Sequence, residues 1–205
     1  GNYGFDLKNT DLKELIKQVL IKTSIERIRV SSLQPKEIDN ELLDIWKSND
    51  RLCPHFHLPL QSGSDQILKK MRRRYSSEEF IQITSLIKKY LPQASITTDV
   101  IVGFPSEKEE DFENTLYTIN KSNLNNLHVF PYSVRPKTTA FYLKDHNSPA
   151  VIKSRSRELN RISKLITTKS MRNIIGKKRS ILWEGKNMNS GLTEDYYRVI
   201  RKSVK

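Results

Sequence analysis

The sequence predicts an α/β fold in which helices and parallel strands alternate, followed by a long helix and a small β-rich unit. Three observations predict it. Helical and strand periodicities alternate through 1–148, with connections long enough for right-handed crossovers, which allows a barrel or a doubly wound sheet. A charged helical pattern then covers 149–174, and 175–205 contains only short strand patterns. We therefore expect three units with these boundaries.

Each element of the first unit follows from the spacing of its apolar residues. In 11–22, leucine, isoleucine and valine recur at helical intervals, whereas 95–102 is rich in β-branched residues, which is typical of a strand. Ser76 and Glu79 have the spacing of a capping box at a helix start. The predicted helices are 11–22, 38–47, 65–73, 78–91 and 107–121, and the predicted strands are 26–31, 55–60, 95–102 and 126–131.

The second and third units follow from patterns after Pro149. Residues 151–174 form one long predicted helix, in which Leu159, Ile162, Leu165 and Ile166 make only a narrow apolar stripe. Two short strands are predicted at 180–183 and 196–200. They predict a small β-rich unit at this end of the sequence.

The charge of the chain is concentrated at its C-terminal end. Lysine and arginine number 36 against 23 acidic residues, and 151–205 alone holds 15 against 4. This bias favours a polyanionic partner, RNA above all, because cations neutralise phosphates and aromatic rings stack on unpaired bases. The alternative is a solvated basic surface with its aromatic rings in the core. The predicted RNA-binding residues are Lys177, Lys178, Arg179, Tyr197 and Arg198.

Cysteine content and hydropathy exclude other classes. The single cysteine, Cys53, cannot form an internal disulfide or a multi-cysteine metal cluster with other residues of this sequence. Cys53, His55 and His57 alternate as strand neighbours do, but Pro54 interrupts the strand and no fourth ligand is evident, so we assign no metal ligands. No apolar run approaches the ~20 residues of a membrane helix, and we expect a cytoplasmic protein without a membrane partner.

Small and hydroxyl residues follow the predicted strands, where ligands bind in parallel α/β folds. For any one of these loops, ordinary turn chemistry is the simpler interpretation. Arg73 lies in a basic triplet that suits a carboxylate or phosphate, or else a solvated face. Asp99, inside a β-branched strand, needs either a structural donor or a ligand.

Four runs of residues resemble radical S-adenosylmethionine methylthiotransferases that act on tRNA. They are His57-Leu58-Pro59-Leu60-Gln61-Ser62-Gly63-Ser64-Asp65, Met71-Arg72-Arg73-Arg74-Tyr75, Thr98-Asp99-Val100-Ile101-Val102-Gly103-Phe104-Pro105, and Phe130-Pro131-Tyr132-Ser133 with Arg135-Pro136. The runs 29–35 and 51–53 are most similar to the branch that acts on N6-threonylcarbamoyladenosine beside the anticodon. The resemblance extends from 1–7 to 191–193, which is similar to the family's TRAM domain.

The resemblance implies a partial radical SAM barrel, similar to a TIM barrel, followed by a truncated TRAM-like RNA-binding barrel. It also implies a tRNA substrate and S-adenosylmethionine and a 4Fe-4S cluster as cofactors. The residues that it places at S-adenosylmethionine or its cavity are Gln61, Ser62, Gly63, Ser64, Arg73, Asp99, Tyr132 and Ser133. No residue is assigned a catalytic role.

The sequence also departs from the family. The CxxxCxxC loop whose thiolates hold the cluster is absent from these 205 residues, so we expect that this chain alone does not catalyse the reaction and that an N-terminal half, upstream or separate, carries the cluster. Ser106 stands where the family has glycine, and we expect it to cap the next helix with Glu109. The alternatives are a non-catalytic RNA-binding protein and, less favoured, a phosphate-binding barrel enzyme that uses the Gln61–Ser64 turn.

Overall fold

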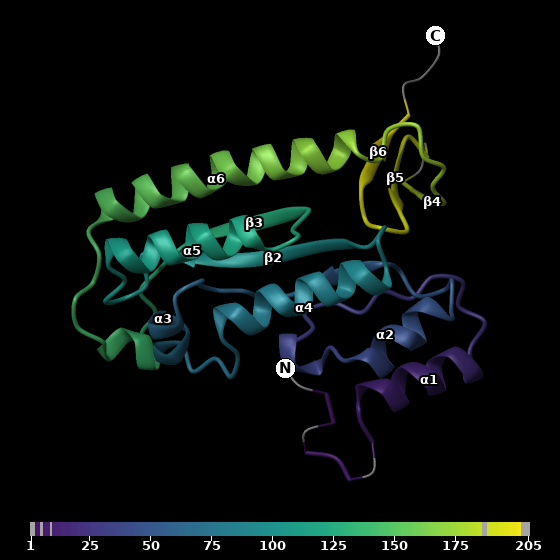
Figure 1. The fold of residues 1–205 in the computed structure, drawn as a ribbon, viewed down its shortest axis with the longest axis horizontal. Helices are drawn as coiled ribbons and strands as arrows, with labels where there is room; N and C mark the ends of the chain where they lie inside the picture. The colour runs from purple at the N-terminus through teal and green to yellow at the C-terminus, as the bar shows by residue number, and fades with distance from the viewer. Residues whose placement is uncertain (1–2, 5, 9, 186–187, 202–205) are drawn as a thin grey trace.

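The computed structural model describes residues 3–4, 6–8, 10–185 and 188–201. Parts of the predicted first and third units lie outside the described residues, including residues 1, 2 and 5 of the segment 1–7, where the family resemblance begins. Within them, a parallel sheet covered by helices is followed by a long helix and a separate antiparallel sheet (Figure 1). The predicted fold class is confirmed. The three unit boundaries stay a prediction.

The parallel sheet has the order β1-β2-β3. Its strands are β1 (His55–His57), β2 (Ser95–Val102) and β3 (Asn126–Pro131), and all of their pairings are parallel. The first unit also contains the α-helices α1 (Leu12–Lys22), α2 (Asn40–Lys47), α3 (Asp65–Lys70), α4 (Ser77–Tyr90) and α5 (Glu109–Lys121), and the 3-10 helices η1 (Pro35–Glu37) and η2 (Thr139–Tyr142).

The helix α6 (Pro149–Arg172) runs antiparallel to β3 and covers its outer side (Figure 1). It leads to the small sheet, whose strands are β4 (Ile181–Glu184), β5 (Ser190–Thr193) and β6 (Arg198–Ile200). This sheet lies beyond the N-terminal ends of the parallel strands, at the end opposite α3 (Figure 1).

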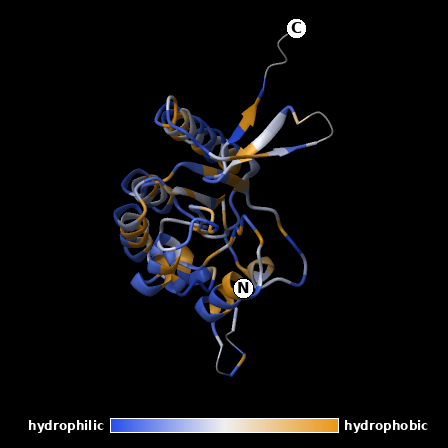
Figure 2. Ribbon diagram, turned by 90° about the vertical axis from the view of Figure 1, so that its right-hand side faces the viewer, coloured by the Kyte–Doolittle hydropathy of each residue, from blue (hydrophilic) through white to orange (hydrophobic). Residues whose placement is uncertain are grey.

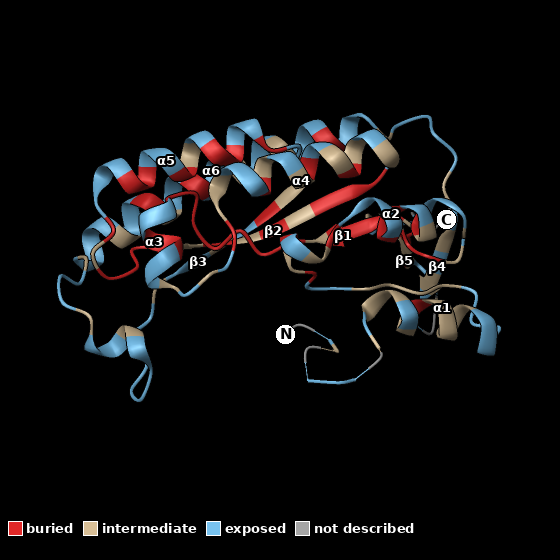
Figure 3. Ribbon diagram, turned by 60° about the horizontal axis from the view of Figure 1, so that its bottom comes forward, coloured by how far each residue is buried: buried red, intermediate tan, exposed pale blue. Residues whose placement is uncertain are grey.

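The core lies between the parallel sheet and its helices. Ile96, Val100 and Val102 of β2 are buried on the helix side, whereas Thr97, Asp99 and Ile101, which alternate with them, are only partly buried. Figure 3 shows the buried faces of α4 and α5 turned toward β2, with their exposed faces outward. Figure 2 shows the same segregation by hydropathy, with apolar residues concentrated in the interior. The alternation is what a strand requires when one of its faces packs on helices.

Four sequence predictions of local structure are wrong. The strand predicted at 55–60 is only β1, His55–His57. The segment 26–31 is not a strand: it makes one isolated bridge, between Ile28 and Leu52. The helix predicted at 65–73 ends at Lys70 because Arg72 has a positive φ of 56°. Ser106 does not cap α5, since it has a φ of 67° and its hydroxyl donates to the carbonyl of Lys144.

Other local predictions are confirmed, and one strand was missed. The N-cap of α5 is Lys108, whose backbone N–H donates to Oδ2 of Asp111 at N3, and the predicted capping box of Ser76 and Glu79 at α4 is present. Strand β5 was not predicted because its glycine and two hydroxyl residues give a weak strand signal. No helix in the described part of the chain is long and apolar enough to cross a membrane.

Candidate functional site

The inner face of the parallel sheet, away from the helices, is polar. Residues of one parity on the three strands share this face, because side chains alternate across a strand and the register pairs Asp99 with His128. They include His55, His57, Thr97, Asp99, Asn126 and His128. A cavity of about 480 Å³ touches this face at the N-terminal ends of the strands. The inner face therefore has room for polar chemistry that the packed outer face lacks.

Asp99 has a structural partner on this face. Its Oδ1 lies 3.1 Å from Nε2 of His57, and both side chains are largely shielded from solvent. The other ring nitrogen, Nδ1, lies 3.4 Å from the hydroxyl of Ser32, which has a φ of 61°. Of the two partners considered for Asp99, the structure thus supplies a structural donor, His57. The hydroxyl of Ser32, the imidazole of His57 and the carboxylate of Asp99 lie next to one another in a hydrogen-bonded row.

His55 is held in a neutral form. Nε of Arg29 donates to its Nδ1 at 3.0 Å, and its Nε2 lies 3.1 Å from the hydroxyl of Thr97. Burial, together with the positive charge of Arg29, lowers the pKa of His55 from 6.5 to about 3. A nitrogen that accepts from an arginine cannot also carry a proton, so the hydrogen bonding agrees with the low pKa.

Gln61 and Arg73 meet at the C-terminal end of the sheet. The backbone of Gln61 bridges to β2, and its side-chain Oε1 accepts from a terminal nitrogen of Arg73 at 3.0 Å. Nε of Arg73 is buried and has no hydrogen-bond partner among the described residues. A buried, unsatisfied guanidinium nitrogen is costly, and a guanidinium matches the geometry of a carboxylate. Arg73 is therefore suited to hold an anionic group.

Tyr132 and Ser133 border a second cavity, of about 860 Å³, just beyond β3. The hydroxyl of Tyr132 is buried without a partner in the described part of the chain, and burial raises its pKa. Ser133 is exposed. The other residues that line the cavity are Pro131, Val134, Phe141, His146, Asn147, Pro149, Ile152, Lys153 and Ser156.

Ser62, Gly63 and Ser64 contact α5 instead of the inner face. The hydroxyl of Ser64 donates to Asp111 at 2.5 Å, and the hydroxyl of Ser62 lies 3.4 Å from that of Thr115. A Cβ on Gly63 would lie only 2.6 Å from the Cα of Thr115. These residues lock the turn against α5, and their predicted contact with S-adenosylmethionine stays a prediction.

The predicted RNA-binding residues divide into two groups. Arg179 is held by the buried Asp195 at 2.9 Å, and the hydroxyl of Tyr197 bonds to Ser170 and to Asn125. Lys177 and Lys178 are exposed, as is Arg198, although Arg198 pairs with Glu184 at 3.2 Å. Arg179 and the hydroxyl of Tyr197 therefore hold the small sheet in place, and Lys177 and Lys178 are available to a partner.

The contact of Tyr196 with His55 and Arg29 was not predicted from the sequence. With a φ of 73°, Tyr196 stacks on His55 at a centroid distance of 4.7 Å and lies 4.0 Å below the guanidinium of Arg29. It thereby fixes the small sheet at the N-terminal end of the parallel strands. A tyrosine next to Tyr197 carries no signal for this contact, because the contact depends on how two distant segments dock.

The two ends of the parallel sheet are far apart. Gln61 and Arg73 lie at the C-terminal end, and the small sheet lies at the other end. Eight residues of β2 at about 3.3 Å each separate these ends by roughly 25 Å. A partner that reaches both ends must therefore be large.

No group of three or more His, Cys, Asp or Glu residues in the described ranges is arranged to hold a metal ion.

Comparison with known proteins finds a solved structure of similar fold and several relatives similar in sequence. A chain of the Escherichia coli coproporphyrinogen III oxidase HemN, described as a radical SAM enzyme, superposes with a TM-score of 0.60 at 20% identity, covering 75% of this chain and 37% of its own. The threonylcarbamoyladenosine tRNA methylthiotransferase MtaB of Aquifex aeolicus is 39% identical over 100% of this chain and 49% of its own length. The tRNA-2-methylthio-N(6)-dimethylallyladenosine synthase of Acetivibrio thermocellus is 39% identical over 90% of this chain and 39% of its own length.

The chain thus spans about half the length, or less, of these curated relatives, and its resemblance to tRNA methylthiotransferases is confirmed. The family model of the radical SAM superfamily matches residues 3–119, which include the parallel strands β1 and β2 and the turn at Gln61. The chain therefore belongs to the radical SAM superfamily.

Proposed function

We propose that this chain is the cofactor-binding and RNA-binding part of a tRNA methylthiotransferase, which adds a methylthio group to a modified adenosine beside the anticodon. The observation that carries the proposal is similarity to such enzymes over nearly the whole chain, small sheet included, at 34–39% identity. The fold supports it as well, because a polar inner face and a strand end with an unsatisfied arginine are what a cofactor site requires.

S-adenosylmethionine fits the residues at the C-terminal end of the sheet. The unpartnered Nε of Arg73 suits the carboxylate of its methionyl group, and Gln61 orients the guanidinium. When bound, S-adenosylmethionine is the source of the radical in enzymes of this kind. The role of this chain is to bind and orient it and to shield it from water, with Tyr132 at the rim.

The 4Fe-4S cluster does not fit this chain. A cluster of that type is held by cysteine thiolates, and these 205 residues contain only Cys53. Cys53 is 3% exposed, and burial raises the pKa of its thiol, which disfavours the thiolate. We infer that the cluster ligands belong to polypeptide outside these residues, either upstream or in a separate N-terminal half, and that this chain is inactive without them.

The adenosine that we favour is N6-threonylcarbamoyladenosine. Relatives that act on it and relatives named for dimethylallyladenosine are equally similar to this chain, so identity does not choose between them. The choice rests on the runs 29–35 and 51–53. Arg29 lies on the inner-face side, against His55, whereas Arg51 donates to three carbonyls in the last turn of α1 and just after it, and has a structural role.

Binding of S-adenosylmethionine to variants of Arg73 tests the cofactor assignment. Loss of a charged hydrogen bond costs about 1.5–3 kcal/mol, so Arg73→Gln is expected to weaken binding about tenfold or more in calorimetry. Arg73→Lys is expected to restore little, because an ammonium lacks the planar fork. Arg72→Gln, an exposed neighbour, is the matched control. Equal affinities in all four proteins would remove Arg73 from the site.

A non-catalytic RNA-binding protein is the second candidate. The concentration of positive charge in 151–205 favours it. In that case the inner face has no cofactor, and the chain binds tRNA but not S-adenosylmethionine. The same calorimetry distinguishes the two functions, because only the enzyme interpretation requires S-adenosylmethionine to bind.

A further inference from the structure

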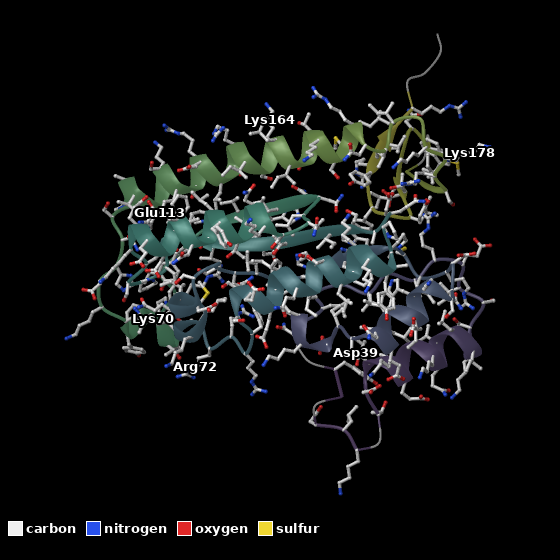
Figure 4. All side chains as sticks on the ribbon, in the orientation of Figure 1. Asp39, Lys70, Arg72, Glu113, Lys164 and Lys178 are labelled. Carbon is white, nitrogen blue, oxygen red and sulfur yellow. The ribbon has the colours of Figure 1, made fainter. Side chains whose placement is uncertain are left out.

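Positively charged side chains line the outer face of α6 along its whole length. The helix contains seven lysines and arginines and one acidic residue, Glu158. At 100° per residue, five of the cations fall within an arc of about 100° on the side opposite the buried Leu159. They are Lys153, Arg157, Arg161, Lys164 and Arg172, all exposed, and we call them the α6 ridge. Figure 4 shows Lys164 on the outer side of α6, pointing away from the sheet.

The ridge is not needed to hold the fold together. None of its five residues forms an ion pair within the described ranges, whereas the remaining basic residue near the helix start, Arg155, is buried and pairs with Glu107. The packing of α6 comes from its opposite face, where Leu159, Ile152 and Ile162 join the core. Like charges held on one helix face repel each other, so the ridge carries a small energetic cost that packing does not explain.

The helix α1 has three lysines and one glutamate, but Lys13 and Lys17 pair with Asp39 and Glu41. The longer helices α4 and α5 do not share the bias of α6. α5 has four acidic residues and one lysine, and α4 has two acidic residues and two lysines. A basic helix face is ordinary when acidic residues alternate with the cations. The single sign on α6 therefore indicates a polyanion as the occupant of this face.

The α6 ridge runs between the two ends of the parallel sheet. α6 is about 36 Å long and spans the parallel sheet from one end to the other. At its start, Lys153 lines the cavity that Tyr132 and Ser133 border. After its end, Lys177 and Lys178 are both exposed. Figure 4 shows Lys178 at the small sheet. The ridge thus connects the two ends of the molecule that a tRNA substrate has to reach.

We propose that the α6 ridge binds the phosphate backbone of the RNA substrate, along a path from the small sheet to the cofactor end of the parallel sheet. The proposal rests on the proposed function for the identity of the RNA. It adds a contact surface that begins beside the cavity at Tyr132 and lies outside the small sheet. The first four ridge cations are about 4.5–6 Å apart along the helix and Arg172 follows about 12 Å further on, which allows several phosphates to be contacted at once.

The test is the salt dependence of binding to an unmodified tRNA transcript, measured by anisotropy from about 50 to about 200 mM KCl. The variant replaces Arg157, Arg161 and Lys164 by glutamine together. Each lost phosphate contact reduces the slope of log affinity against log salt by about 0.7–0.9, so we expect a reduction of about 2. The matched control replaces Lys69, Lys70 and Lys89, which are exposed on α3 and α4, by glutamine. It removes the same charge, and Figure 4 shows Lys70 on a different side of the molecule from Lys164.

The control is expected to keep the slope of the parent chain. The ridge variant is also expected to melt no lower than the parent, because its substitutions relieve repulsion and leave the packed face intact. If the ridge variant and the control have equal slopes, the ridge proposal is wrong while RNA binding by the chain, and with it the proposed function, stands. If the parent chain shows no salt-dependent binding, the ridge proposal fails too, and the modified nucleosides of cellular tRNA then decide the proposed function separately.

Discussion

A terminal nitrogen of Arg155 on α6 lies 2.6 Å from Oε1 of Glu107, and both side chains are almost completely buried. Glu107 also accepts from the backbone N–H of Gly103, at the end of β2. A second nitrogen of Arg155 reaches Glu109, at the start of α5. One arginine therefore joins the long helix to the loop at the C-terminal end of the sheet, next to the cavity at Tyr132.

Loss of Arg155 should lower the free energy of unfolding more than loss of any ridge residue does. Arg155→Met leaves Glu107 buried without its partner, and we expect the free energy of unfolding to fall by about 3–5 kcal/mol. Urea denaturation measures the effect. Arg157→Met, on the exposed face, is expected to change stability by less than about 0.5 kcal/mol. The double variant Arg155→Met with Glu107→Leu should recover part of the loss, and a double variant less stable than Arg155→Met would contradict this account.

The pKa of His55 predicts a pH dependence of stability. Because its folded pKa of about 3 lies below the unfolded value of 6.5, unfolding takes up a proton at acidic pH. Its contribution is complete above pH 6.5 and is lost as the pH falls toward 3. Between pH 7 and pH 5, we expect His55 to account for about 2 kcal/mol of lost stability.

His55→Gln isolates this effect in urea denaturation at the two pH values. Glutamine can accept from Arg29 and donate to Thr97, as His55 does. His57 and His128 also face this region and Tyr196 stacks on it, but these groups are present in both proteins. The variant should lose less stability on acidification than the parent. An identical loss in both proteins would show that His55 is not the group responsible.

Gly63 should tolerate no side chain. An added Cβ meets the backbone of α5 at 2.6 Å and 2.8 Å, and backbone atoms cannot move aside as a flexible side chain can. Gly63→Ala is therefore expected to lower the free energy of unfolding by about 2–3 kcal/mol. Gly176→Ala is the control, since nothing lies within 4 Å of its added Cβ and only its positive φ of 79° opposes alanine, at about 1 kcal/mol. Both variants are measured by thermal and urea denaturation. If Gly63→Ala and Gly176→Ala lose the same stability, the turn at Gly63 can move away from α5.

Local patterns predicted most of the secondary structure. Apolar periodicity located β2, β3 and α6 because each packs one face on the core, and the capping box of Ser76 and Glu79 fixed the start of α4. The segment 26–31 has the same kind of pattern but makes only a bridge at Ile28. Strand formation depends on a neighbouring strand to pair with, and a pattern within the segment cannot supply one.

The contacts that the candidate site residues make within the fold were not predictable from the sequence. The sequence indicated that Asp99 needs a partner, yet His57 became that partner through the pairing of β1 with β2. Ser62 and Ser64 follow a strand as ligand-binding residues do, and tertiary packing turned both toward α5. Which partner a polar side chain finds is decided by the assembled fold, and this is the information that a single sequence carries least directly.

The modified nucleosides of cellular tRNA test the central claim most directly. In the organism that carries this gene, total tRNA from a deletion strain is digested and its adenosine derivatives are compared by mass spectrometry with those of the parent. The account predicts that the methylthio group on N6-threonylcarbamoyladenosine disappears, returns with the intact gene, and does not return with Arg73→Gln. Unchanged methylthio-adenosines in the deletion strain would contradict the assignment of this chain to a tRNA methylthiotransferase.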